Sequence, residues 1–172
     1  VLAKTAPAIF VLLWSTGFVG SKLGAPYIEP MVFLTVRFAA VLPLLLVLAL
    51  LLAKSWPKTP AAIFHCIVTG MLVHGIYLGG VFWAIKQGMP AGASSIIVGL
   101  QPVLTALIAV TLLSETVSWK HWLSMAIGIA GLGLVLGPKF DLGGSGITPA
   151  TIGAVVGAVI AISLGTVYQK RF

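Results

Sequence analysis

Long apolar runs constrain this sequence more than any other feature. A helix needs about 20 mostly apolar residues to cross a hydrocarbon core about 30 Å thick. Six segments of the 172-residue chain are long and apolar enough: Ala6–Gly24, Met31–Ala53, Ala61–Ile85, Ala91–Ser114, Trp119–Gly137 and Thr151–Tyr168. Short links that contain most of the prolines separate these segments. The pattern predicts an all-α integral membrane protein, a polytopic bundle with six transmembrane helices.

Composition agrees with this class and excludes several others. Only 8% of the residues are charged and 59% are hydrophobic, whereas a soluble domain carries roughly a quarter charged residues. The net charge of +7 comes from isolated basic residues at segment ends, so it does not indicate nucleic-acid binding. With one cysteine, Cys66, no P-loop and no metal-spaced ligand cluster, we expect no disulfide within the chain, no cofactor, no metal site and no enzyme activity.

The distribution of Lys and Arg predicts an orientation. One set of links and termini carries six basic residues: Lys4, Lys54, Lys58, Lys120, Lys170 and Arg171. The other set carries three: Lys22, Lys86 and Lys139. Because links on the cytoplasmic side are richer in Lys and Arg, we expect the N-terminus in the cytoplasm and a location in a bacterial-type cytoplasmic (inner) membrane.

Polar residues cluster in the fourth apolar segment, whose residues 91–102 read "AGASSIIVGLQP". On one helix they would form a stripe at three- and four-residue steps: Ser94, Ser95, Val98, Gln101, Pro102 and Thr105. A polar stripe at membrane depth should face protein or a water-filled cavity, so it either links helices by hydrogen bonds or lines a binding cavity. Pro102 removes a backbone hydrogen bond and is a candidate hinge.

Five further residues are candidates for binding a solute, with a packing role as the alternative. Arg37 lies inside the second segment, where it would either anchor the helix at the interface or attract an anion such as a carboxylate. His74 and Tyr77 share a helical face. Trp14, followed by Ser15, falls near the middle of the first segment, away from the interfacial belts where tryptophan is usual.

Acidic residues avoid the apolar segments. Because no carboxylate lies within a span, the chain offers no obvious intramembrane proton carrier. Glu115 follows the fourth segment, where the end of a helix disfavours a carboxylate. We expect it either to pair with a structural partner such as Lys120 or to remain solvated.

A weak internal repeat relates the first and last segments. Sliding the sequence by 148 residues sets "WSTGFVGSK" (14–22) against "ISLGTVYQK" (162–170), with Ser15 opposite Ser163. The last segment is the fifth after the first, so the two copies would run in opposite directions, as in inverted-repeat transporters. The chain would then hold one repeat and the first helix of another. Since it begins with Val, we expect it to be part of a longer protein.

Several motifs together resemble a known family. They are "LLWSTGFVGSKLG", "EPMVFLTVRFAA", "FWAIKQGMPAGASSIIVGLQPVLTALIAVTLLSE", "IGIAGLGLVLG" and, near the end, "GAVVGAVIAISLGTVYQKR". In this order and spacing the sequence resembles the drug/metabolite transporter superfamily, specifically the EamA-like domain. The resemblance implies ten helices in two inverted five-helix repeats. Residues 1–137 would be the first repeat, 138–150 a connecting loop and 151–172 the first helix of a truncated second repeat.

The resemblance also implies a function. EamA-like members move small metabolites, such as amino acids and related compounds, often outward, by alternating access. The implied substrate-binding positions, with Arg37 added from its placement, are Trp14, Ser15, Arg37, His74, Tyr77, Ser95, Gln101 and Ser163. The expected partners are a small-molecule substrate, the lipid bilayer, and either a second copy or a missing C-terminal half. The alternative is a membrane scaffold that transports nothing and whose polar residues only pack helices.

Overall fold

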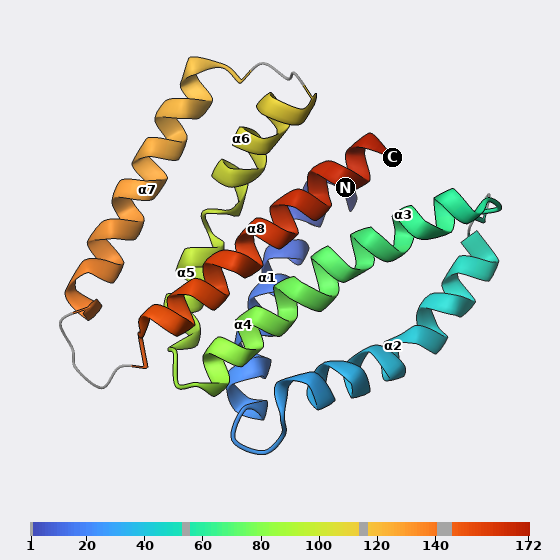
Figure 1. Cartoon of the computed structure of the whole chain (residues 1–172), viewed down its shortest axis with the longest axis horizontal. Helices are drawn as coiled ribbons and strands as arrows, with labels where there is room; N and C mark the ends of the chain where they lie inside the picture. The colour runs from blue at the N-terminus through green and yellow to red at the C-terminus, as the bar shows by residue number, and fades with distance from the viewer. Residues whose placement is uncertain (1, 53–55, 114–116, 141–145) are drawn as a thin grey trace.

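The computed structural model describes residues 2–52, 56–113, 117–140 and 146–172, and within these ranges it consists of helices without strands (Figure 1). The elements in chain order are α1 (Leu2–Gly24), α2 (Pro30–Leu52), α3 (Pro60–Gly70), η1 (Met71–Ile76), α4 (Tyr77–Lys86), α5 (Ala91–Val98), α6 (Gln101–Leu113), α7 (Trp119–Phe140) and α8 (Pro149–Arg171). The π-helical turn η1 joins α3 and α4 into one continuous helix.

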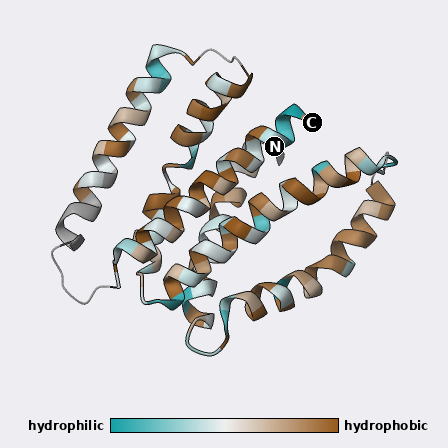
Figure 2. Cartoon of the chain, viewed as in Figure 1, coloured by the Kyte–Doolittle hydropathy of each residue, from teal (hydrophilic) through white to brown (hydrophobic). Residues whose placement is uncertain are grey.

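Several of the described helices have the length and composition of membrane spans. Four segments are long and apolar enough to cross a bilayer: Pro30–Leu52, Pro60–Lys86, Ala91–Leu113 and Pro149–Arg171. In α1, Ala8–Gly24 forms a shorter apolar helix. Hydrophobic residues cover most of the helical surface, and hydrophilic residues gather toward helix ends and links (Figure 2). The predicted fold class, a polytopic α-helical membrane protein, is confirmed.

The six predicted segments alternate in direction (Figure 1). On one side of the molecule, α1, α4 and α7 end where α2, α5 and α8 begin. A hydrogen bond from Lys86 Nζ to the carbonyl oxygen of Ala25, 2.7 Å long, joins two of these ends. Both termini lie on the opposite side. The starts of α3 and α7 and the end of α8 lie on that side, and with them Lys58, Lys120, Lys170 and Arg171. Lys54, which the sequence assigns to the same face, lies outside the described residues.

Two helices begin with the same local device. In α3 the Thr59 hydroxyl accepts a hydrogen bond from the Ala62 N–H, and Pro60 occupies the first turn. In α8 the side chains of Thr148 and Thr151 each accept a hydrogen bond from the backbone N–H of the other, which forms a capping box. Pro149 occupies the first turn of α8, as Pro60 does in α3. A threonine cap satisfies an N–H group that the helix leaves open, and proline supplies the φ angle of the first turn without losing a bond. The sequence Thr-Pro thus fixes where both helices start.

The centre of the bundle is α8, which lies antiparallel to the helix built from α3, η1 and α4 (Figure 1). At one end Tyr168 contacts His65, and toward the other end Gly80 meets Ala154. A Cβ atom on Gly80 would lie 2.9 Å from the Ala154 carbonyl oxygen. Such close backbone approach is how small residues drive helix association in lipid, where the hydrophobic effect gives no preference.

Several observed helices differ from the predicted segments. The fourth segment is not one regular helix, because a turn at Gly99 and Leu100 separates α5 from α6. Because the break places Pro102 in the first turn of α6, its missing N–H group costs no hydrogen bond within the helix. The third segment contains the unpredicted turn η1, and α7 continues to Phe140, beyond the predicted end at Gly137.

Candidate functional site

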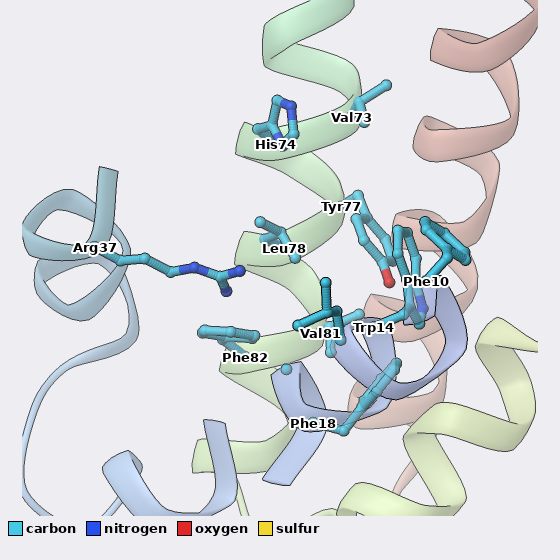
Figure 3. A pocket seen from close by; sticks show the side chains of 12 residues that line it. Phe10, Trp14, Phe18, Arg37, Val73, His74, Tyr77, Leu78, Val81 and Phe82 are labelled. Carbon is cyan, nitrogen blue, oxygen red and sulfur yellow. The ribbon is translucent and has the colours of Figure 1, made fainter. Parts of the chain in front are cut away.

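Two adjoining cavities lie among α1, α4 and their neighbours. The first, called here the Arg37 cavity, has a volume of about 240 Å³ and is lined by Phe10, Leu13, Trp14, Gly17, Phe18, Arg37, Val73, His74, Tyr77, Leu78, Val81 and Phe82. It is shown in Figure 3. The second, the Gln101 cavity, has a volume of about 500 Å³. Four residues line both cavities: Phe10, Trp14, Phe18 and Val73.

Aromatic rings form the shared boundary. Trp14 stacks against Tyr77 with ring centroids 6.1 Å apart and planes at 21°, and Phe10 lies 5.2 Å from Trp14 on the same helix (Figure 3). Tyr77 is only 3% exposed, whereas Trp14 is 38% exposed. Tyr77, although buried, lines the Arg37 cavity, and the more exposed indole ring of Trp14 lines both cavities.

Arg37 enters the first cavity from α2, and its guanidinium group points toward Leu78 and Phe82 on α4 (Figure 3). It forms no hydrogen bond or ion pair with any side chain in the part of the chain that the structure describes. His74, on η1, contacts the edge of Phe38 at 5.7 Å. The cavity thus combines one unpaired cation with a mainly aromatic wall.

The turn η1 carries the side of the cavity that faces α8. Its widened hydrogen bonding is seen at the end of the turn, where the Tyr77 N–H bonds to the Leu72 carbonyl five residues earlier. Val73 and His74, although consecutive, both line the Arg37 cavity. Single π-helical turns occur frequently at functional sites, and this turn lies against both cavities.

The Gln101 cavity is built around the break between α5 and α6. Ser95, Gln101 and Pro102 line it on one side, and Thr166 and Gln169 of α8 line it on another. Ser15 of α1 also faces it. The hydroxyl groups of Ser15 and Ser95 donate to carbonyls of their own helices, those of Leu12 at 3.0 Å and Gly92 at 2.8 Å. These side chains therefore do not join one helix to another.

The predicted polar stripe reaches this cavity at four of its six positions, on both sides of the break: Ser95, Val98, Gln101 and Pro102. Ser95 and Gln101 reach the cavity, but Ser94 is fully buried and its Oγ has no partner among the described residues. The Thr105 hydroxyl is likewise buried and unpaired within the described ranges. The stripe thus continues across the turn at Gly99 and Leu100, but it does not include Ser94 and Thr105.

Ser163 occupies a different environment from its repeat counterpart Ser15. It is fully buried in α8, and its Oγ lies 3.4 Å from the Gln101 carbonyl oxygen. It is not among the side chains that line either cavity. Glu115 lies outside the described residues. Within the described ranges, no three His, Cys, Asp or Glu side chains approach closely enough to hold a metal ion.

Several cavity residues were not selected from the sequence: Phe10, Phe18, Val73, Phe82, Thr166 and Gln169. One signal was available, because Phe10, Trp14 and Phe18 recur at four-residue spacing and so share one face of α1. Val73 and Phe82 gave no signal. An apolar residue beside a cavity and one beside lipid look the same in a membrane sequence.

Comparison with known proteins places these cavities in a family context. The profile of the EamA-like transporter family matches residues 6–137. A "Probable amino-acid metabolite efflux pump" of Salmonella typhimurium is 24% identical over 163 residues, covering 95% of this chain and 52% of the relative. The "Uncharacterized transporter YvbV" of Bacillus subtilis is 26% identical over 170 residues, again covering 95% and 52%.

A third relative is the "Uncharacterized inner membrane transporter YedA" of Escherichia coli K12, 28% identical over 166 residues, with 95% of this chain and 51% of the relative covered. The chain spans about half the length of the curated relatives it matches. No solved structure matches it. Since the family profile covers most of the sequence, the chain belongs to the EamA-like transporter family.

Proposed function

We propose that the chain takes part in moving a small metabolite, an amino acid or a related compound, outward across the cytoplasmic membrane by alternating access. Membership of a transporter family supports transport, and the printed name of the Salmonella relative supports an amino-acid metabolite and efflux. The excess of basic residues at the end that bears both termini supports a cytoplasmic N-terminus. We also propose that the chain is divided into a first repeat at 1–137, a connecting loop at 138–150 and the first helix of a second repeat at 151–172.

The observation that carries this proposal is the pair of cavities that meet at Trp14. Together they offer aromatic surface, one guanidinium group and the polar side chains of Ser95 and Gln101. Ligand pockets combine a largely apolar lining with a few polar groups that fix the orientation of the ligand. In our proposal Trp14 and Tyr77 contact the apolar part of the substrate, and Gln101 and Ser95 form hydrogen bonds to it.

Alternating access requires a place where the bundle can bend. The break at Gly99 and Leu100 lies directly before Pro102, and both Gly99 and Pro102 line the Gln101 cavity. Backbone at membrane depth that is not helical is tolerated where it lines a cavity. We propose that α6 pivots at this break and so changes which side of the membrane the cavity faces.

Transport by vesicles containing the full-length protein tests the proposal. With radiolabelled amino acids and their deaminated analogues as probes, we expect counterflow above that of protein-free vesicles. The double substitution Trp14→Ala and Gln101→Ala removes one stacking surface and one hydrogen-bonding side chain, and should lower the rate at least about tenfold. Trp119→Ala with Gln87→Ala is the matched control, since both residues are exposed and line neither cavity. Unchanged transport in the double variant would contradict the site.

A further inference from the structure

We propose that the Arg37 cavity takes an aromatic carboxylate that carries no ammonium group, so that an arylacetate is preferred over the corresponding amino acid or amine. This inference rests on the proposed function and narrows its substrate class. It follows from three properties of the cavity: an unpaired cation, a stacked aromatic wall and a lining without acidic side chains.

The first property is the charge of Arg37. Its guanidinium group enters the cavity beside Phe82 (Figure 3) and has no anionic partner within the described ranges. A charged side chain at membrane depth normally pairs with an opposite charge or with polar groups. Guanidinium is planar and binds a carboxylate through two parallel hydrogen bonds. A ligand carboxylate would supply the counter-charge that the described protein does not.

The second property is the aromatic wall across the cavity from Arg37. Trp14 and Tyr77 lie nearly parallel with ring centroids 6.1 Å apart. Phe82, whose ring centroid lies 5.7 Å from that of Phe33, adds a further ring beside Arg37. Aromatic rings gain stabilisation from offset-stacked and edge contacts with another ring beyond the area that they bury. The volume of about 240 Å³ lies below the range of about 300–1,000 Å³ typical of drug-sized ligands. A molecule with a single ring suits this volume.

The third property is a lining without acidic side chains that could pair with the ammonium group of a ligand. None of the side chains that line either cavity, all from described residues, is acidic. The three acidic residues of the chain fall in links between the apolar segments: Glu29, Glu115 and Asp141. Of these, Glu29 lies 3.7 Å from Lys86, away from the cavity. An ammonium group would therefore enter beside Arg37 without a carboxylate to pair with, and like charges repel.

A matched set of ligands tests the inference. Phenylacetate, phenylalanine and phenethylamine share one ring and differ in charge, and their binding to the purified chain in phosphatidylcholine nanodiscs can be measured by titration calorimetry. We expect phenylacetate to bind at least about tenfold more tightly than phenylalanine, and phenethylamine to bind most weakly. Cyclohexylacetate should bind more weakly than phenylacetate, and Trp14→Ala should remove that difference.

Substitutions at Arg37 identify the group responsible. Arg37→Gln should abolish the preference for phenylacetate over phenylalanine, and Arg37→Lys should retain part of it. Lys120→Gln removes a cation from α7, outside both cavities, and should change nothing. A melting temperature measured for each variant separates loss of binding from loss of folding. A preference for phenylacetate that survives Arg37→Gln in a folded variant would overturn the assignment.

The two levels of the proposal fail differently. If phenylalanine binds as tightly as phenylacetate and both need Trp14, the anion preference is wrong while the proposed transport site stands. If none of the three ligands binds, the inference is wrong, and the vesicle transport assay decides the proposed function separately. A lipid phosphate is an anion, like the carboxylate of phenylacetate, and is the competing ligand for Arg37. If Arg37 binds the phosphate, phosphatidylglycerol in the nanodiscs would displace phenylacetate by an amount that Arg37→Gln abolishes, and the aromatic carboxylate would be excluded as the native partner.

Discussion

Gly165 of α8 lies so close to Val73 of η1 that a Cβ atom on Gly165 would come within 2.6 Å of the Val73 Cγ2 and 3.0 Å of the Leu72 Cβ. The contact presses the central helix of the bundle against the π-helical turn that lines both cavities. The contact between Gly165 and Val73 therefore affects both the packing of α8 and the shape of the candidate site.

This contact predicts the effect of adding one methyl group. Gly165→Ala should lower the free energy of unfolding by about 1–3 kcal/mol, because overpacking forces the backbones apart. Gly157→Ala, on the same helix but with nothing within 4 Å of the added atom, should be neutral or slightly stabilising. Unfolding in detergent, followed by circular dichroism, measures both. The steric explanation is wrong if Val73→Ala fails to restore any stability to Gly165→Ala.

Lys86 predicts a second difference in stability. Its Nζ donates to the Ala25 carbonyl at 2.7 Å and lies 3.7 Å from the exposed carboxylate of Glu29. Lys86→Met should cost about 1–2 kcal/mol because it removes a hydrogen bond from a charged donor. Glu29→Gln should cost less than about 1 kcal/mol, since exposed ion pairs contribute little. Equal losses in the same unfolding assay would show that the ion pair, and not the carbonyl contact, joins the two ends.

His65 and Tyr168 predict a third difference, at the other end of α8. The Tyr168 hydroxyl and His65 Nδ1 are 2.5 Å apart, and His65 stacks on Phe172 with centroids at 4.3 Å and planes at 7°. Tyr168→Phe keeps the ring but removes the hydrogen bond, so it should cost about 0.5–1.5 kcal/mol. The double variant with His65→Ala should show a coupling energy of similar size. Strictly additive losses would mean that the two side chains do not interact.

The helices could be predicted from the sequence because crossing a bilayer demands long apolar runs, and Thr59 with Pro60 and Thr148 with Pro149 mark two of the starts. The turn η1 could not be predicted. It packs against Gly165, which is distant in the sequence, and the run Met71–Ile76 is as apolar as an ordinary helix. Phe82 could not be selected either, because the sequence does not distinguish an apolar residue that lines a cavity from one that faces lipid.

Ser94 and Ser95 show why the polar stripe could be predicted only in part. Both are small hydroxyl residues in one short helix, yet Ser94 is fully buried and unpaired among the described groups while Ser95 lines a cavity. Which of two neighbours faces a cavity depends on how α5 is rotated against α1 and α8.

The alternative role, a scaffold with polar residues that only pack helices, makes a separate prediction. Replacing both Ser95 and Gln101 by alanine removes no hydrogen bond between helices made by their side chains within the described structure. We therefore expect stability to change by less than about 1 kcal/mol while the relative rates for different substrates change. A scaffold would lose stability and show no substrate-dependent effect in the same vesicles.

The central claim is that the cavity side of α5 and α6 is reached by water and solute at the middle of the bilayer. Cysteine labelling tests it most directly: in an active Cys66→Ala background, Ser95→Cys and Gln101→Cys are treated in intact vesicles with a small, charged thiol reagent. Both should react, and more slowly when substrate is present, whereas Ser94→Cys, one residue away and fully buried, should not. If the cysteines at 95 and 101 are as unreactive as the one at 94 throughout the transport cycle, the cavity is not a solute pathway.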